Sequence, residues 1–250
     1  MTPGSGAGAS ELRWPRGTLL DALESSEVAA LFSRGARRVF APRETLIIEG
    51  DSSKDVFLLL NGWVKVIGSS ADGRRVLLSI RSRGDAVGEL AALDDGPRSA
   101  SVIAIATVTA CILTQAQFLA VVGASPTAAL AVARADAAKM RLATRHRTDV
   151  SGAPVLQRAA RVLEYLTEAH ATPCAEGLRI DVPLTRAELA ELVGAAEPSL
   201  YRALAYLRDR HVVLMRNRRY IVCDPVALEK ISLSADPETG PPGSRTAKGE

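Results

Sequence analysis

Two charged residues, Glu89 and Arg98, lie nine positions apart in a segment of mostly small or apolar residues. A Gly96-Pro97 turn separates them, and an apolar, strand-like run follows. A carboxylate accepts hydrogen bonds from hydroxyl groups such as those of a ribose, and a guanidinium fork matches two phosphate oxygens. If residues 89–91 begin a helical turn, their backbone N–H groups also point at the anion. One ligand with hydroxyls and a phosphate would satisfy both side chains; the alternative is a salt bridge across a surface loop.

A second candidate site lies in residues 185–207, whose pattern predicts two short amphipathic helices joined by a tight turn. Thr185 and Glu188 have the spacing of a capping box, and Gly194 supplies the positive φ that the turn needs. The side chains expected to face the core are Leu189, Leu192, Val193, Leu200, Leu204 and Leu207. This geometry is typical of helices that read DNA. The alternative is an ordinary helical hairpin.

A basic turn, Arg216 to Arg219, lies between the strand-like runs 212–214 and 220–223. The three together predict a β-hairpin directly after the second helix. Its positive charges suit contact with a phosphate backbone, as in a wing.

The elements that must position the first site lie between residues 38 and 114. There, short β-branched or apolar runs alternate with turn signals at intervals of about ten residues, which is typical of an antiparallel barrel or sandwich. Asp72-Gly73 predicts a hairpin turn. The expected strands are residues 39–40, 45–48, 56–60, 63–67, 76–80, 102–105 and 110–113.

Helical apolar spacing appears over residues 18–34, 126–150 and 155–171. The longest of these carries small and apolar residues on one stripe, which lets a second helix approach closely. We expect this stripe to form a dimer seam; the alternative is a helix packed on its own domain. The stripe consists of Leu130, Ala133, Ala137, Met140 and Leu142. Residues 151–154 are expected to form a linker and residues 172–177 a loop.

Length and composition indicate how many domains to expect and which classes of protein are excluded. The 250 residues, 47% hydrophobic, are enough for one or two domains with a real core, and a net charge of +3 is compatible with a nucleic-acid partner. Residues 1–10 lack the apolar core of a signal peptide, and the apolar stretch 119–132 is interrupted and too short to span a bilayer. We therefore expect a soluble, cytoplasmic protein with no membrane partner.

Catalytic and metal-binding patterns are not found in the sequence. The three cysteines, Cys111, Cys174 and Cys223, are far apart, and there are three histidines, so no metal site is predicted. Neither a P-loop nor a nucleophile elbow occurs, and we expect no enzyme. Cys111 and Cys223 are expected to be core residues.

The segment from Gly88 to Ala100 resembles the phosphate-binding cassette of cyclic-nucleotide-binding domains, with the pattern G-E-L-A-x-L followed by P-R-S-A. With the strand-rich region, the long helix and the winged helix-turn-helix, residues 18–233 resemble the Crp/Fnr family of bacterial transcription regulators. The resemblance implies an α+β fold with a jelly-roll-like β-roll. The implied parts are a disordered extension 1–17, a cyclic-nucleotide-binding domain 18–124, a dimerisation helix 125–151, a winged helix-turn-helix 152–233 and a disordered tail 234–250.

The resemblance implies roles for the cassette residues. Glu89 would hold the ribose 2′-hydroxyl, Arg98 and Ser99 the cyclic phosphate, and Thr144 of the long helix would read the purine. The other implied ligand-binding residues are Gly88, Leu90, Ala91, Leu78, Ser79 and Lys139. The effector would be cAMP, with cGMP left open, and no cofactor or metal is implied.

On the DNA side the resemblance is weaker, because Glu197-Pro198 stands where cAMP receptor proteins have an Arg-Glu pair. Proline is tolerated in a first helical turn, but Glu197 cannot make the bidentate guanine contact of an arginine. We therefore expect a different operator from the familiar one. The implied DNA-binding residues are Thr185, Arg186, Glu197, Pro198, Ser199, Tyr201, Arg202, Arg216, Arg218 and Arg219.

The resemblance implies a homodimer in which the nucleotide favours one packing of the subunits, with the recognition helices about 34 Å apart in successive major grooves of DNA. It also implies contact with RNA polymerase through residues 171–177. Two alternatives stay open: a regulator with a degenerate pocket that binds DNA constitutively, and a nucleotide-binding module that acts on a protein partner. The cysteine cluster needed for FNR-type oxygen sensing is missing.

Overall fold

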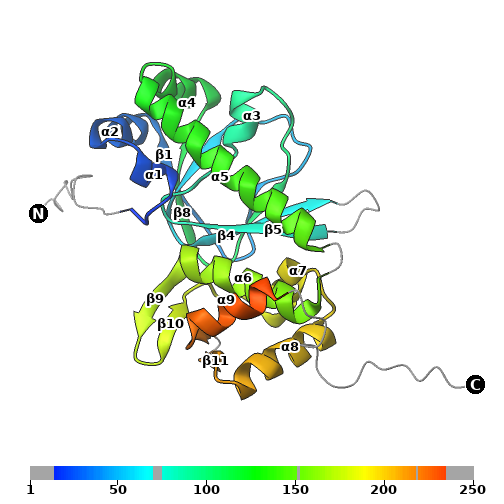
Figure 1. The fold of residues 1–250 in the computed structure, drawn as a ribbon. Coiled ribbons are helices and arrows are strands. Elements are labelled where there is room, and N and C mark those ends of the chain that lie inside the picture. The colour runs from blue at the N-terminus through cyan, green and yellow to red at the C-terminus, as the bar shows by residue number, and fades with distance from the viewer. Residues whose placement is uncertain (1–13, 70–74, 151–152, 218, 235–250) are drawn as a thin grey trace, which may run out of the picture. The chain divides into compact units, whose positions relative to one another are not determined.

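The computed structural model describes residues 14–69, 75–150, 153–217 and 219–234, without the side chains of residues 75 and 142–150. The chain divides into two compact units between Ala143 and Thr144. The first is built mainly of β-strands and the second mainly of helices (Figure 1). We describe each unit by itself.

Two four-stranded antiparallel sheets form the N-terminal unit. One has the order β1 (Ala36–Phe40), β8 (Val108–Leu113), β3 (Val56–Asn61), β6 (Ala86–Val87); the other has β2 (Thr45–Ile47), β7 (Ser101–Ala104), β4 (Trp63–Ser69), β5 (Arg75–Ser82). A core of alternate strand residues fills the space between them, including Phe40, Phe57, Val64, Val102 and Val108. The predicted β-roll is confirmed.

Helices cover the outer side of the β1-β8-β3-β6 sheet. They are α1 (Leu19–Ala22), α2 (Ser25–Arg34), α4 (Gln115–Val122) and the first part of α5 (Pro126–Val150). Their apolar faces and the sheet share a second core, which includes Leu20, Leu31, Leu58, Leu113 and Phe118. The short helix α3 (Glu89–Leu93) follows β6.

Packing of the chain begins earlier than the sequence suggests. Trp14 lies inside the extension 1–17 that was expected to be disordered, but its ring contacts Phe32 edge-on at 6.0 Å between centroids. The guanidinium of Arg83 covers the same ring at 4.8 Å. The expectation of disorder is wrong from Trp14 onward, because one large aromatic side chain suffices to attach the segment.

The long helix α5 presents two different faces. Ala128, Ala131 and Val132 are buried against the N-terminal unit. The other face carries most of the predicted stripe, and its residues Leu130, Ala133, Ala137 and Met140 are exposed. The side chain of Leu142 lies outside the described residues. The alternative, in which the stripe packs on its own domain, is therefore wrong for these four residues.

The C-terminal unit combines helices with one small sheet. Its elements are α6 (Val155–His170), β9 (Ala171–Cys174), β10 (Gly177–Ile180), α7 (Arg186–Val193), α8 (Glu197–Asp209), β11 (Val213–Arg216), β12 (Arg219–Val222) and α9 (Pro225–Leu233). The sheet order is β11-β12-β10-β9. Strands β11 and β12 form the predicted wing hairpin.

The loop expected at residues 172–177 is instead the hairpin of β9 and β10, which extends the sheet of the wing. Pro173 suggested a loop, but β9 is the edge strand, where a missing N–H costs no ladder bond. Gly177 has φ +139°, and a Cβ there would lie 2.9 Å from the Cα of Cys223. The glycine therefore permits close approach of the strands and does not mark a loop.

The three cysteines differ in burial. Cys111 is buried, as predicted, whereas Cys174 and Cys223 are only partly buried, so the expectation that Cys223 is a core residue is wrong.

No single helix within the described ranges is long and apolar enough to cross a membrane. Helices α4 and α5 up to Arg141 would pass together by length and composition, but they are bent by 114° relative to each other.

Candidate ligand-binding and DNA-binding sites

The turn before α3 can be formed only by a glycine. Gly88 is the N-cap of α3 and has φ +86°, a conformation that residues with a side chain rarely adopt. A Cβ at this position would lie 2.6 Å from Nη1 of Arg98 and 2.8 Å from the carbonyl oxygen of Asp55. Gly88 therefore lets the arginine approach the start of α3 and places Glu89 in its first turn.

The guanidinium of Arg98 is buried and held by its own chain. Its side chain donates from Nη1 to the carbonyl oxygen of Gly88 (2.9 Å), from Nη2 to that of Asp55 (2.7 Å) and from Nε to Oγ of Ser53 (3.2 Å). Burial lowers the pKa of Arg98, and the carboxylates of Asp55, Asp51 and Glu89 oppose this effect. A cation with only 3% exposure is thus kept at a fixed place and orientation.

Glu89 is also buried, with 4% exposure, and is bound on one side only. Oε1 accepts a hydrogen bond from Nζ of Lys139 at 2.6 Å, whereas Oε2 is buried without a hydrogen-bond partner. Lys139 also donates to Oδ1 of Asp136 (3.3 Å) and to the carbonyl oxygen of Ala86 (3.2 Å). Burial raises the pKa of Asp136, and Lys139 lowers it in turn.

Arg98 and Glu89 do not pair with each other. Each has its own partners among the described residues, and both are almost inaccessible to water. The alternative of a surface salt bridge is therefore wrong. A buried polar atom without a partner is uncommon in proteins and needs a reason. A ligand hydroxyl at Oε2 of Glu89 would supply the missing partner, and the nearby cation suits an anionic group on the same ligand.

The structure places the other predicted ligand residues in varied surroundings. Ala91 is buried in α3, while Leu90 and Ser99 are exposed. Leu78 and Ser79 lie in β5: Ser79 is buried opposite Val66, and Leu78 is 44% exposed at the register shift between β4 and β5. Thr144 belongs to α5, but its side chain lies outside the described residues.

Sequence reasoning missed several residues of this site. Ser53 and Asp55 hold Arg98, and Asp55 does so through its main-chain carbonyl, which leaves no signal in the sequence. Asp136 contacts Lys139 and stands three positions before it, a spacing that would have revealed the pair on a helix. Lys54, at the rim, donates to the carbonyl oxygen of Gly96.

The helix-turn-helix has the predicted local structure. Oγ1 of Thr185 accepts a hydrogen bond from the backbone N–H of Glu188 at 3.2 Å. In return, Oε2 of Glu188 accepts a hydrogen bond from the backbone N–H of Thr185 at 2.9 Å. Gly194 ends α7 with φ +64°, and α8 begins at Glu197 with Pro198 in its first turn. The capping box, the turn glycine and the tolerated proline are confirmed.

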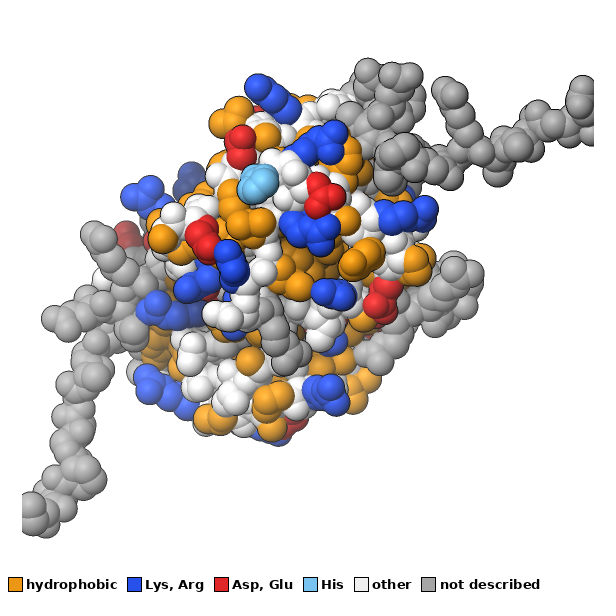
Figure 2. Space-filling model, turned by 90° about the horizontal axis from the view of Figure 1, so that it is seen from below, with side chains coloured by type: hydrophobic (Ala, Val, Ile, Leu, Met, Phe, Trp, Pro, Cys, Tyr) orange, Lys and Arg blue, Asp and Glu red, His pale blue; other side chains and the backbone are white. Residues whose placement is uncertain are grey.

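The predicted DNA-binding residues of α7 and α8 have few contacts with one another. The guanidinium of Arg186 lies 5.9 Å from the ring centre of Tyr201, and Nη2 of Arg202 donates to Oγ of Ser199 at 3.2 Å. Glu197 and Pro198 are exposed. In the view from below, Lys and Arg side chains lie around a hollow with hydrophobic walls (Figure 2).

The wing contributes further positive charge. Arg216 and Arg219 are paired across the hairpin, and Nε of Arg216 lies 3.3 Å from Oε1 of Glu176 in the neighbouring β9–β10 turn. Arg218 lies outside the described residues. Because Glu176 partly compensates the charge of Arg216, Arg219 is the one of the two described wing arginines without that opposing carboxylate.

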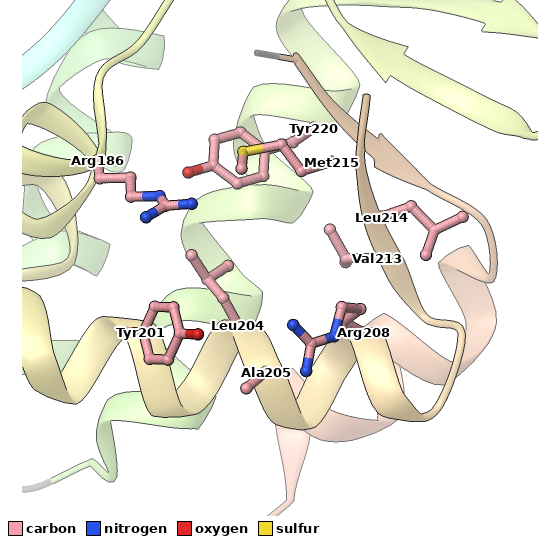
Figure 3. A pocket seen from close by; sticks show the side chains of 9 residues that line it. All are labelled: Arg186, Tyr201, Leu204, Ala205, Arg208, Val213, Leu214, Met215 and Tyr220. Atoms are coloured by element: carbon pink, nitrogen blue, oxygen red, sulfur yellow. The ribbon is translucent and has the colours of Figure 1, made fainter. Parts of the chain in front are cut away.

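A hollow of about 450 Å³, including the part open to solvent, lies between α7, α8 and the wing (Figure 3). It is lined by Arg186, Tyr201, Leu204, Ala205, Arg208, Val213, Leu214, Met215 and Tyr220. Leu204, expected in the core, is only half-buried and faces this hollow. The expectation is wrong here because the wing stands away from α8 at this point.

Comparisons with known proteins agree with this architecture. The chain matches the family models of the cyclic nucleotide-binding domain over residues 37–125 and of the Crp-like helix-turn-helix domain over residues 157–231. It is 27% identical over 215 residues to a CRP-like cAMP-activated global transcriptional regulator of Mycobacterium tuberculosis, covering 86% of this chain and 96% of that protein. It is 26% identical over 214 residues to the cyclic AMP receptor protein of Thermus thermophilus, with the same coverage.

Solved structures show the same fold. A CooA mutant from Carboxydothermus hydrogenoformans superposes with a TM-score of 0.72 at 17% identity, covering 88% of this chain and 98% of that one. FixK2 from Bradyrhizobium japonicum gives a TM-score of 0.70 at 18% identity, covering 81% and 99%. The two matched family models and the sequence relatives define a transcription regulator with a cyclic-nucleotide-binding domain and a DNA-binding helix-turn-helix. The chain belongs to the Crp/Fnr family.

Proposed function

We propose that this protein is a homodimeric, cytoplasmic regulator that binds cAMP in its N-terminal unit and then binds DNA through α8 and the wing. The observation that carries the proposal is the buried pair of Glu89 and Arg98. They are held apart, and Oε2 of Glu89 lacks a partner. Ribose hydroxyl and cyclic phosphate are the groups that such a pair would bind.

The choice of cAMP rests on the function of relatives. The regulators of Mycobacterium tuberculosis and Pasteurella multocida, 27% and 25% identical, are both described as cAMP-activated. In this chain the 2′-hydroxyl of the ribose would bond to Oε2 of Glu89, and the phosphate oxygens would bond to the guanidinium of Arg98 and to the Ser99 hydroxyl. Thr144 would contact the purine.

Calorimetric titration of nucleotide-free protein with cAMP, cGMP and 2′-deoxy-cAMP tests this proposal. We expect saturable binding of cAMP and weaker binding of cGMP. The 2′-deoxy analogue should bind about tenfold more weakly than cAMP, because one hydrogen bond to a charged group is lost. No heat with either natural nucleotide, from folded protein, would indicate a degenerate pocket and DNA binding without a ligand.

The exposed stripe of α5 supports the homodimer. Leu130 and Met140 are 49% and 71% exposed on a helix whose opposite face is buried, so an apolar surface is left for a second copy. The nucleotide would favour one subunit packing by binding it more tightly. Sedimentation velocity should give a dimer, and Ala137→Glu should shift it towards monomer. A wild-type monomer at micromolar concentration would contradict the proposal.

For the DNA target, we expect an operator different from that of cAMP receptor proteins, because Glu197 accepts hydrogen bonds and cannot donate to guanine. Selection from random DNA checks this, and recovery of the familiar operator would falsify it. The β9–β10 hairpin is our candidate for contact with RNA polymerase. Ala175→Leu, at an exposed position of its turn, should then reduce activated transcription while leaving DNA binding unchanged.

A further inference from the structure

The C-terminal unit contains a hollow whose occupant has not been assigned so far (Figure 3). Its volume of about 450 Å³ includes the part that is open to solvent. Most of its wall is aliphatic and comes from α8 and the first wing strand: Leu204, Ala205, Val213, Leu214 and Met215. A ligand in this hollow would need an apolar body.

One polar group of the wall has no partner. Tyr220 is 4% exposed, and its buried hydroxyl makes no hydrogen bond in the described structure. Buried tyrosine hydroxyls normally find a partner. Burial raises the pKa of Tyr220, an effect that Arg186 opposes, so the hydroxyl is a proton donor at neutral pH.

The unpartnered hydroxyl points toward a cation. In Figure 3 the Tyr220 hydroxyl and the guanidinium of Arg186 face one another across the upper part of the hollow. Arg186 has no ion pair within the described residues, and its guanidinium lies 5.9 Å from the ring centre of Tyr201. The second guanidinium, of Arg208, is bonded to Oδ1 of Asp209 at 2.8 Å. The site thus offers two adjacent donors, one of them charged, above aliphatic walls.

We infer that this hollow binds a small organic acid, with one carboxylate and a compact aromatic or aliphatic body. The carboxylate accepts hydrogen bonds from the Tyr220 hydroxyl and from Arg186, and the body packs on Leu204, Val213 and Met215. Arg186 and Tyr201 are also predicted DNA contacts. The occupant therefore competes with DNA, which makes this a second effector site, separate from the nucleotide site.

Methionine-methyl NMR of the full-length protein tests the inference with benzoate as the probe. The chain has three methionines, and Met215 lines the hollow whereas Met140 lies exposed on α5 and serves as an internal control. Benzoate should shift the Met215 signal saturably and leave that of Met140 unchanged. Benzamide, which has the same shape without the charge, should bind at least about tenfold more weakly.

Two matched variants complete the experiment. Tyr220→Phe removes only the hydroxyl and, because that hydroxyl has no partner, should not destabilise the fold; it should weaken benzoate binding about tenfold. Tyr206→Phe, whose ring stacks on Arg210 outside the hollow, should bind benzoate like the wild type. Equal binding of benzoate and benzamide, wild-type affinity of Tyr220→Phe, or a Met215 shift that does not saturate would each overturn the inference. None of these readouts depends on cAMP or DNA.

Discussion

The two sites of this protein use arginine in opposite ways. Arg98 is buried and bonded to three oxygens of its own chain before any ligand arrives. Arg186 and Arg202 are exposed and held less firmly: Arg186 lies over the Tyr201 ring, and Arg202 donates a hydrogen bond to Ser199. A ligand of fixed shape favours such a preorganised site, because little freedom is then lost on binding. Phosphates along DNA can be followed by side chains that adapt.

The same difference appears in the sequence. The buried cassette follows the family pattern through Glu89 and Arg98, whereas the exposed start of α8 departs from it at Glu197 and Pro198. Changing Glu89 or Arg98 would leave buried groups unpaired, but changing Glu197 disturbs no packing. The residues that set DNA specificity can therefore change at little cost in stability, whereas a change in the residues that would bind the ligand costs stability.

Arg98→Ala should have the largest effect. It removes the fork that binds phosphate and leaves the carbonyls of Gly88 and Asp55 without their donors. We expect cyclic-nucleotide affinity to fall on the order of 100-fold. Calorimetric titration measures this, with Arg98→Lys as the variant that keeps the charge but not the fork. Affinity within a few-fold of wild type would mean that the preorganised arginine is structural only.

Two glycine variants compare the stability of the units. Gly88→Ala introduces a positive-φ strain and a contact 2.6 Å from Arg98, so it should cost about 2–3 kcal/mol. Gly194→Ala introduces the φ strain of a helix end and should cost about 1 kcal/mol. Both tryptophans, Trp14 and Trp63, lie in the N-terminal unit, so denaturation followed by their fluorescence should detect the first change only. A fluorescence shift from Gly194→Ala would show that the units unfold together.

Arg202→Ala tests the adaptable side of the comparison. Loss of one phosphate or base contact should weaken DNA binding about tenfold and, for a phosphate, reduce the salt slope by about one. Arg210, which stacks on Tyr206 at the end of α8, offers the matched control Arg210→Ala. Equal effects in gel-shift titrations would mean that only total charge matters.

Glu27→Gln should have the smallest effect, about 1 kcal/mol. Hydrogen bonds from Ser125 and Thr127 hold the pKa of Glu27 below its ordinary value of 4.5. A lowered pKa stabilises the fold above the ordinary value and loses this contribution as the pH falls through the lowered one. Wild type should thus lose more stability than the variant between neutral and acidic pH. Glu168→Gln, on an exposed residue of α6, should match wild type in the same denaturation series.

The types and spacing of side chains predicted most of the helices and strands. Contacts made by main-chain atoms could not be predicted, because every residue type carries the same carbonyl group. The capping box of Thr185 and the β-roll strands follow from residue types. The carbonyls that hold Arg98 carry no residue signature, and β6, with two residues, is too short to give a period. Pro173 suggested a loop because its place at a sheet edge cannot be known before the sheet is.

The two sites also differ in how far the sequence could predict them. Glu89 and Arg98 could be found because their types and turn residues form one continuous segment, whereas the hollow between α8 and the wing depends on how two separate elements diverge. Tyr220 is an ordinary strand residue by type, and the sequence gives no sign that its hydroxyl lacks a partner.

The unbroken length of α5 fixes how its side chains are arranged around the helix axis. Its 25 residues run without interruption through the boundary between the two units at Ala143. In an α-helix each residue adds about 1.5 Å of length and about 100° of rotation. A single residue inserted between Leu130 and Ala137 would turn Ala137 by more than a quarter of a turn relative to Leu130, so the residue count of this helix keeps the exposed apolar stripe on one face.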